Sequence, residues 1–333
     1  MARRFLVAPD AFKGTLTAAE VAVAIADGLR GAGAEAVECP VADGGEGTIE
    51  ALSRVLSLEL RTSRCSDPLG RPLVATWALM DGATAIVEMA AASGLALVAE
   101  EERDAERASS AGTGELLVAA FQAGAKQSIL AIGGTATSDG GAGALEAIEA
   151  AGGLGEMTLE LACDVSIPYE RAAEVFGPQK GATHEAVARL TRRLHALADG
   201  WPRDPRGLAM TGAGGGLAGA LWSLHGARLR SGASFVLEEL GFDALLERAD
   251  AVVVGEGCLD GQSRHGKIAG EILDRARARS IPVHAVVGSV EAAAVEREWS
   301  ALASTRIAGT RAELRRAGAE LAVERGSAAA ARG

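Results

Sequence analysis

The sequence predicts an α/β protein of two domains, and three observations support this fold class. Two strand–loop–helix units follow one another near the N-terminus, a pattern typical of a parallel sheet. Apolar runs on both sides of Asp81-Gly82 predict a hairpin, and therefore antiparallel strands, in the middle of the chain. After Val283 the chain returns to the parallel strand–helix pattern. Its 333 residues are enough for two domains of ordinary size.

The two N-terminal units place charged residues directly after their strands. Strands are expected over residues 4–8 and 37–41, and each is followed by a loop and a helix. Ligands bind at the carboxyl ends of the strands in parallel sheets. Two charged loops at one sheet edge therefore favour a binding site over simple helix caps. The charged residues in these loops are Asp10, Lys13, Asp43 and Glu46.

A second domain with a mixed sheet is expected to begin at the turn-rich segment Ser66–Pro72. The predicted hairpin follows, with strands over residues 73–79 and 83–89. Glu88 lies inside the second apolar run. A carboxylate there is costly to bury unless it is paired or functional.

The most prominent loop is the glycine-rich stretch Gly133–Gly143, between a buried strand and a helix. Its glycines permit positive φ and close approach of a ligand, and backbone N–H groups at a helix start favour phosphate. Asp139 is placed to cap the helix or to hold a cation. A tight turn without a ligand explains the glycines equally well. The polar groups that we expect to face a ligand are those of Thr135, Thr137 and Ser138.

Two further polar loops lie nearer the C-terminus. The glycines of Gly214–Gly219 match the spacing of a dinucleotide-binding fingerprint, but residues 204–210 form only a poor strand before them. A buried strand over 251–254 precedes a loop in which Glu256 and Lys267 are part of a dense polar cluster. A polar surface loop is the alternative interpretation of that cluster.

Composition excludes several classes of protein. The net charge of −11 argues against broad nucleic-acid binding. The chain contains no run of about 18 apolar residues, so no membrane span is predicted. The first apolar run is too short for a signal peptide, so we expect a cytoplasmic protein. The four cysteines form no metal-binding pattern and are expected to be small, reduced and buried.

The residue inventory points toward chemistry on phosphates or small acids. Glycine loops, carboxylates at loop tips and a few isolated cations supply what phosphoryl transfer needs, although they also suit a sugar-phosphate isomerase or a binding protein. No Walker A sequence, protein-kinase motif set or nucleophile elbow is present.

Eight motifs in a fixed order resemble the type 1 glycerate kinase family and cover nearly the whole chain. They are Ala8–Gly14 (APDAFKG), Ala42–Thr48 (ADGGEGT), Asp67–Arg71 (DPLGR), Glu88–Leu95 (EMAAASGL), Ile132–Gly143 (IGGTATSDGGAG), Ala162–Val165 (ACDV), Val175–Ala182 (VFGPQKGA) and Gly255–Gln262 (GEGCLDGQ).

The resemblance implies transfer of the ATP γ-phosphoryl group to D-glycerate at the 2-hydroxyl. For this transfer we expect Mg²⁺ held by carboxylates, and a reaction in an interdomain cleft. The resemblance also implies a discontinuous Rossmann-like or flavodoxin-like parallel domain into which a mixed α/β domain is inserted. The expected borders are 1–66 plus 276–325 for the first domain and 67–275 for the second, with a disordered tail over 326–333. A monomer or a homodimer is expected.

As a hypothesis for this reaction, we assign a role to each candidate residue. Asp43 is the first choice for the base that takes the hydroxyl proton, Asp260 is the second, and Lys13 assists catalysis. The expected glycerate contacts are Asp10, Lys13, Arg71, Glu88 and Ser93. The expected ATP phosphate contacts are Gly133, Gly134, Thr135, Thr137, Ser138, Gly140, Gly141, Lys180 and Lys267. The expected Mg²⁺ ligands are Glu46, Asp139 and Glu256.

The chain departs from the family pattern at two shortened segments, near 148–158 and 166–174, and Ala11 stands where a serine is usual. These departures concern substrate detail and activity level. They leave open a small-acid-binding protein of the same fold with weakened catalysis. The spacing of Gly214–Gly219 leaves open a second alternative, a dinucleotide-dependent oxidoreductase.

Overall fold

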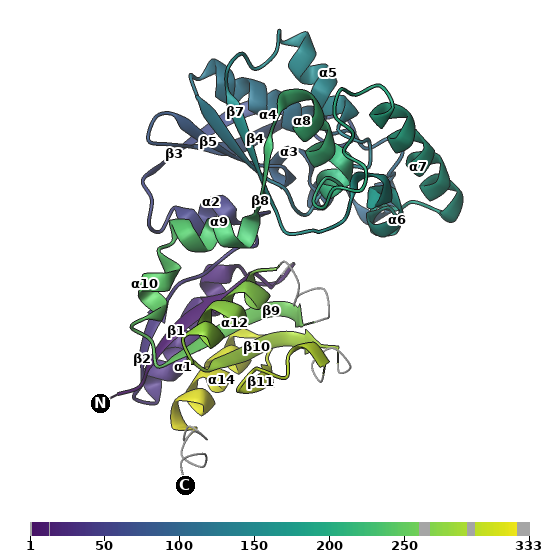
Figure 1. Ribbon diagram of the computed structural model, residues 1–333. Helices are drawn as coiled ribbons and strands as arrows, with labels where there is room; N and C mark the ends of the chain where they lie inside the picture. The colour runs from purple at the N-terminus through teal and green to yellow at the C-terminus, as the bar shows by residue number, and fades with distance from the viewer. Residues whose placement is uncertain (1, 13, 260–266, 292–296, 325–333) are drawn as a thin grey trace. The chain divides into compact units, whose positions relative to one another are not determined.

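The computed structural model describes residues 2–12, 14–259, 267–291 and 297–324, which form two compact units (Figure 1). Unit 1 comprises Met1–Ala42 and Leu237–Gly333, and unit 2 comprises Asp43–Val236. Unit 1 is thus discontinuous in sequence and unit 2 is inserted into it. The predicted fold class, a parallel α/β domain with an inserted mixed α/β domain, is confirmed.

Unit 1 is built on a five-stranded sheet in the order β11-β10-β9-β1-β2, and its strand pairs are parallel. The strands are β1 (Arg4–Pro9), β2 (Glu35–Glu38), β9 (Ala251–Leu259), β10 (Val283–Val290) and β11 (Ser304–Ile307). The parallel sheet predicted from the strand–helix pattern is confirmed. All five strands place their carboxyl ends at the same edge.

Helices α1 (Ala18–Gly31) and α14 (Arg311–Val323) pack on one face of this sheet, against Phe5 and Val7 of β1. The two helices approach closely because a Cβ on Gly28 would lie only 1.9 Å from the Arg315 carbonyl oxygen. A capping box of Thr17 and Glu20 begins α1. Helix α10 (Phe242–Leu246) and helix α12 (Ile268–Ala278), which contacts β9, also belong to the unit.

Unit 2 contains a six-stranded mixed sheet in the order β3-β4-β5-β6-β7-β8. The pairs β3–β4 and β4–β5 are antiparallel, which confirms the hairpin predicted at Asp81-Gly82, and the remaining pairs are parallel. The strands are β3 (Leu58–Ser66), β4 (Pro72–Met80), β5 (Thr84–Glu88), β6 (Gln127–Ala131), β7 (Thr158–Cys163) and β8 (Arg228–Ser231).

Apolar side chains of β4 to β7 form the core of unit 2 with helices α4, α5 and α8. A smaller cluster around the buried Tyr169 joins α6 and α7, and Figure 1 shows α7 at the end of the unit opposite β3. The helices are α2 (Thr48–Leu52), α3 (Ala90–Ser93), α4 (Ala111–Gln122), α5 (Ala142–Ala150), α6 (Ala172–Phe176), α7 (His184–Ala198), α8 (Leu217–His225) and α9 (Gly232–Glu239). Short 3-10 turns lie at Leu95–Leu97, Glu100–Glu102, Tyr169–Arg171, Pro178–Lys180 and Ala213–Gly216.

The borders between the units lie elsewhere than the sequence suggests. They fall at 42/43 and 236/237, whereas the expected borders were 66/67 and 275/276. The second border moves because β9 pairs with both β1 and β10, which places residues 251–259 in the centre of the unit 1 sheet. The first border moves because residues 43–52 pack against the ends of the unit 2 strands. The expected tail over 326–333 is outside the described residues.

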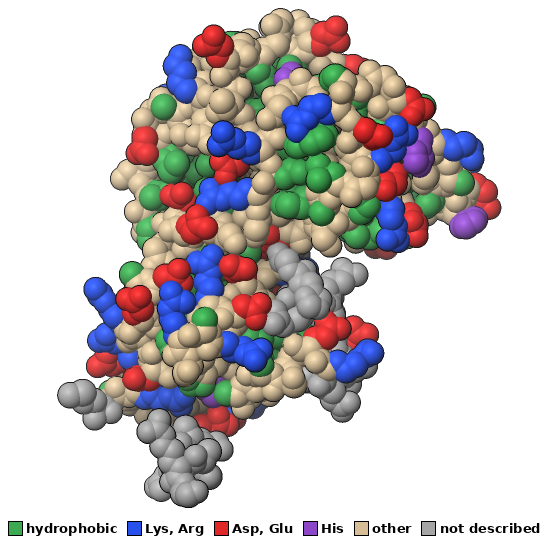
Figure 2. Space-filling view, in the orientation of Figure 1, with side chains coloured by type: hydrophobic (Ala, Val, Ile, Leu, Met, Phe, Trp, Pro, Cys, Tyr) green, Lys and Arg blue, Asp and Glu red, His purple; other side chains and the backbone are tan. Residues whose placement is uncertain are grey.

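Charged side chains of both signs are interspersed over the face drawn in Figure 2. Among the described residues, no helix has the length and apolar character that crossing a bilayer would need.

Candidate functional site

Four parallel strands of unit 2 end at one edge of its sheet, and polar groups follow directly after them. Glu88 closes β5, Gly133 and Gly134 follow β6, Asp164 follows β7 and Gly232 follows β8. The turn Asp43–Thr48 packs onto this edge. We call the group Asp43, Glu46, Glu88 and Asp164 the carboxylate edge.

Close backbone contacts hold the Asp43–Thr48 turn in place. Within the turn, the Gly45 N–H donates to Asp43 Oδ1 at 3.1 Å and the Thr48 hydroxyl donates to the Gly45 carbonyl at 2.8 Å. Gly44 has φ of 82°, and a Cβ there would lie 2.2 Å from the Gly232 Cα. A Cβ on Gly45 would lie 3.0 Å from the Gly133 Cα. These glycines are needed because three backbone segments converge here.

Glu88 anchors the start of α2 and lies among other acidic groups. Its Oε1 accepts the Ile49 N–H at 2.7 Å. Burial raises the pKa of Glu88, the charges of Glu46 and Glu50 act in the same direction, and hydrogen bonds from the Ile49 and Gly47 backbone oppose them. The carboxylate that interrupts the predicted strand is therefore satisfied by backbone donors, and it still lies in a locally negative environment.

Asp164 was not among the predicted site residues. Its Oδ1 accepts the Gly232 N–H at 2.8 Å and its Oδ2 accepts the Ala233 N–H at 2.9 Å. Burial raises the pKa of Asp164 to about 8, helped by the nearby charge of Asp43 and opposed by the hydrogen bonds that it accepts. The signal was present in the sequence, because an aspartate directly follows the apolar run that ends at Cys163.

Only the first part of the glycine-rich loop is accessible. Gly134 is exposed and Gly133 half-buried, whereas residues 135–141 are buried. The Thr137 and Ser138 side chains are fully buried, and among the described residues the Ser138 hydroxyl has no hydrogen-bond partner. In this structure Thr135, Thr137, Ser138, Gly140 and Gly141 therefore lie inside the protein rather than on a ligand-facing surface.

Packing against a second loop explains these buried glycines. The Gly140 N–H donates to the Gly215 carbonyl at 3.0 Å, and a Cβ on Gly215 would lie 2.0 Å from the Thr137 carbonyl oxygen. The Gly214–Gly219 loop thus supports the first glycine loop. Residues 201–212, all described, contain no strand, so this loop lacks the strand that a dinucleotide fingerprint requires.

Asp139 is occupied by hydrogen bonds. Its carboxylate accepts from the N–H and hydroxyl of Ser110, both at 2.8 Å, and from the N–H groups of Gly141 and Gly143, both at 3.1 Å. Four donors on a side chain that is 3% exposed hold the start of α5 against α4. This geometry is that of a helix cap, one of the two roles that the sequence allowed, and leaves little room for Mg²⁺.

Lys180 lies beneath the same loop. Its Nζ donates to the Thr137 carbonyl at 2.5 Å and to the Thr135 hydroxyl at 3.3 Å, and the residue is 3% exposed. Burial lowers the pKa of Lys180 to about 8, with the Asp139 charge acting in the opposite direction. The ammonium group therefore supports the loop from inside.

Two other predicted contacts are engaged within unit 2. Arg71 donates to Asp67 at 2.5 Å and to Glu102 at 3.1 Å. Ser93 is fully buried, and its hydroxyl lies 2.7 Å from that of Thr113. Lys13 and Asp260 lie outside the described residues.

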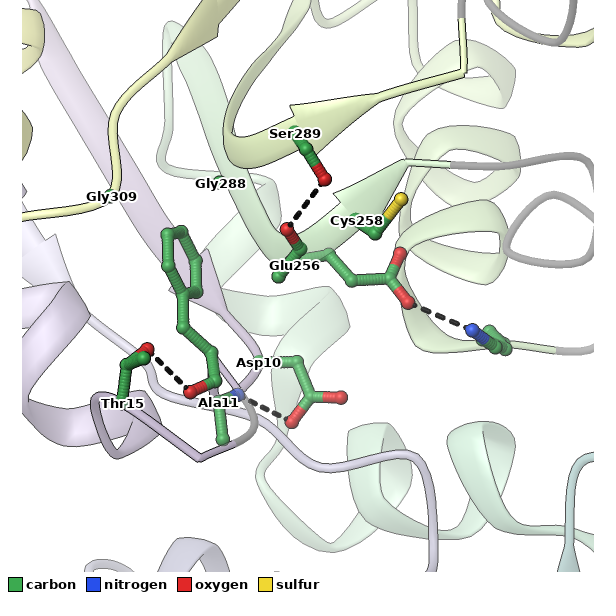
Figure 3. A pocket seen from close by; sticks show the side chains of 11 residues that line it. Asp10, Ala11, Thr15, Glu256, Cys258, Gly288, Ser289 and Gly309 are labelled. Carbon is green, nitrogen blue, oxygen red and sulfur yellow. Dashed lines mark hydrogen bonds and ion pairs between the residues drawn. The ribbon is translucent and has the colours of Figure 1, made fainter. Parts of the chain in front are cut away.

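The carboxyl edge of the unit 1 sheet carries a cavity of about 470 Å³ (Figure 3). It lies where β1, β9 and β10 end. Glu256 faces it and pairs with Lys267 Nζ at 3.0 Å. Its remaining lining is Asp10, Ala11, Phe12, Thr15, Gly257, Cys258, Gly288, Ser289 and Gly309.

Sequence reasoning found the carboxylate and the lysine of this cavity but missed Ser289 and Cys258. Ser289 follows the apolar run of β10 and donates to the Gly257 carbonyl at 3.4 Å (Figure 3). The position of Ser289 shortly after the apolar run 283–287 was the available signal. The cavity thus mixes one ion pair, an aspartate and hydroxyl groups, which suits a polar ligand.

Comparison with known proteins shows the family and supports the fold. The profile of the Glycerate kinase family matches residues 5–153 and 149–325. The chain is 37% identical to a glycerate kinase of Bacillus subtilis (strain 168) and to a glycerate 2-kinase of Escherichia coli (strain K12), in each case over 86% of this chain and 85% of the relative. The crystal structure of a putative glycerate kinase 2 from Salmonella typhimurium LT2 superposes with a TM-score of 0.76 at 34% identity, covering 97% of this chain and 98% of that one. The chain belongs to the glycerate kinase family of phosphotransferases.

Proposed function

We propose that this enzyme transfers the γ-phosphoryl group of ATP to the 2-hydroxyl of D-glycerate and yields 2-phosphoglycerate. The observation that carries the proposal is the carboxylate edge. There the Asp43–Thr48 turn is held on the ends of β6 and β8 by backbone contacts too close for any side chain. Family membership supplies the substrate class, and the relative named a glycerate 2-kinase supports the 2-position.

Asp43 is the proposed base. The residue is half-buried, and its Oδ1 already accepts the Gly45 N–H at 3.1 Å, which orients the carboxylate. A carboxylate fixed in this way takes the proton from the substrate hydroxyl as the oxygen attacks phosphorus, and the proton ends on Asp43. Gly133 and Gly134 are the accessible residues of the glycine-rich loop, and their N–H groups are the proposed contacts to phosphate oxygens.

The three predicted Mg²⁺ ligands fit the ion unequally. Glu46 is exposed, and its Oε2 lies 3.4 Å from the position of a Cβ on Gly134, beside the proposed phosphate contacts. Mg²⁺ binds through one or two carboxylates together with phosphate oxygens and water, so Glu46 fits. Glu256 is already paired with Lys267, and Asp139 is filled by its four donors. When bound, Mg²⁺ would neutralise charge on the phosphoryl oxygens.

The cavity of unit 1 is the second part of the proposal. Asp10 and Ser289 line it with polar groups, and Lys267 is the proposed phosphate contact there. Its volume of about 470 Å³ falls within the range of small-molecule sites.

The direct test is ADP release by the purified chain with ATP, Mg²⁺ and D-glycerate, measured against L-glycerate and glycerol. Phosphorus NMR of the product then assigns the 2- or 3-position. Binding of glycerate without ADP release would overturn the kinase proposal in favour of the small-acid-binding alternative. The NAD-dependent alternative has lost its structural support, and a fluorescence titration with NAD checks it independently.

Glu46→Gln tests the proposed metal ligand. We expect the Mg²⁺ concentration for half-maximal rate to rise several-fold, about 1 kcal/mol of binding energy, with a smaller change at saturating Mg²⁺. Glu50→Gln is the matched control, because Glu50 is an exposed glutamate on the adjoining helix α2. An unchanged Mg²⁺ dependence in Glu46→Gln removes Glu46 from this role. Cytoplasmic location and the monomeric or dimeric state stay predictions.

A further inference from the structure

The Asp43 turn is held from outside by a backbone segment that the proposed mechanism does not use. This segment is Ser231–Ala233, where β8 ends and α9 begins. A Cβ on Gly232 would lie 2.4 Å from the Asp43 carbonyl oxygen and 2.7 Å from the Gly44 Cα. The position of Gly232 therefore sets the position of the Asp43 backbone.

Asp164 in turn holds Ser231–Ala233. Its Oδ1 accepts the Gly232 N–H at 2.8 Å and the Ser231 hydroxyl at 3.2 Å, and its Oδ2 accepts the Ala233 N–H at 2.9 Å. The Ser231 hydroxyl also accepts the Ser234 N–H at 3.1 Å. Both carboxylate oxygens thus fix the first residues of α9 to the end of β7.

We propose that Asp164 is a positioning residue for Asp43, which it places through the Gly232 backbone. This inference rests on the proposed function only in that Asp43 is taken as the base. The chain of contacts runs from the end of β7 to the start of α9 and then to the Asp43–Gly44 turn. Small displacements of a catalytic group reduce rate strongly, so an indirect hold on Asp43 affects kcat.

Hydrogen bonding rather than charge carries this role. Asn offers an oxygen in the same place as Oδ1, so it keeps the bonds from Gly232 and Ser231 and loses the one from Ala233. Ala loses all three. We therefore expect Asp164→Ala to lower kcat by about 10- to 100-fold with little change in either KM, and Asp164→Asn to recover most of that loss.

A second variant reaches Asp43 without touching Asp164. Gly232→Ala places a methyl group against the Asp43 carbonyl, and we expect the same selective loss of kcat. Gly31→Ala is the matched control, because a Cβ at Gly31 meets nothing within 4 Å. Circular dichroism and thermal melts establish that each variant is folded before its kinetics are compared.

A double-variant cycle decides between positioning and a general structural effect. If Asp164 acts through Asp43, the kcat loss of Asp164→Ala disappears in the Asp43→Asn background, where the base is already absent. Losses that multiply independently, or a kcat equal to wild type in folded Asp164→Ala and Gly232→Ala, overturn the proposal. If Asp43→Asn itself keeps the wild-type rate, the proposed base is wrong, while selective kcat losses in the other two variants would still locate a functional group at this contact.

Discussion

The two sheet edges differ in how they compensate their carboxylates. In unit 1, Glu256 is paired with Lys267 at the wall of an open cavity. In unit 2, Glu88 and Asp164 accept backbone hydrogen bonds, and burial, together with neighbouring acidic charges, raises the pKa of both. Lys180, which contacts the glycine loop after β6, is buried beneath that loop.

The difference shows that topology places a site but does not set its electrostatics. Both edges lie at the carboxyl ends of parallel strands, where ligands bind. At the carboxylate edge, excess negative charge suits a cation and a proton acceptor. In the unit 1 cavity, an ion pair and hydroxyl groups suit direct contact with a polar ligand.

The largest effect should come from removing the carboxylate of Asp43. Asp43→Asn keeps an oxygen for the Gly45 N–H, so the turn stays in place, and kcat should fall by about 10²- to 10⁴-fold. Steady-state ADP release measures it. Asp81→Asn, at the exposed hairpin turn, is the matched control and should be neutral. A near-normal rate in Asp43→Asn would show that the carboxylate edge is not the reacting centre.

The burial of Lys180, in contrast to the ion-paired Lys267, should make the free energy of unfolding depend on pH. The pKa of Lys180 is about 8 in the folded protein against 10.5 for an ordinary lysine. Between these values the unfolded chain binds more protons, so the contribution of Lys180 to stability rises with pH. The stability difference between wild type and Lys180→Met should therefore increase by about 3 kcal/mol from pH 8 to 10.5.

Urea unfolding across that pH range measures the difference. Lys126→Met, at an exposed lysine, should show a nearly constant difference from wild type. A flat profile for Lys180→Met would mean that the buried ammonium is better compensated than its contacts indicate.

In unit 1, loss of Lys267 should affect binding more than turnover. Lys267→Met removes the proposed phosphate contact and leaves Glu256 without this partner, so KM for ATP should rise about 10-fold, the equivalent of one charged hydrogen bond. Glu256→Gln leaves Lys267 in place and should raise KM for ATP by a smaller factor. An effect confined to the KM for glycerate would assign the cavity to the acid instead.

The smallest effect concerns stability alone. Thr310 caps α14 in a capping box with Glu313, and Thr310→Ala should cost about 1 kcal/mol of unfolding free energy. Thr183→Ala makes the same change at the cap of α7 in unit 2. Neither should alter kcat, and comparison of their melting curves shows whether the two units unfold together. A change in kcat would contradict the separation of these caps from the sites.

Local sequence patterns predicted the strand–helix units, the hairpin and the strand-end positions of the candidate residues. They also contained the eight motifs of the family. Periodicity, turn residues and caps act over a few neighbouring residues, so they are readable without a structure.

Tertiary structure alone decided which strands share a sheet and which side chains reach solvent. It placed β9 between β1 and β10 and moved the Asp43–Thr48 turn onto unit 2. It also buried residues 135–141 under a second glycine loop and revealed Asp164 as a partner of the Gly232 backbone. These outcomes depend on contacts between residues far apart in the chain, and no local pattern encodes such a pairing.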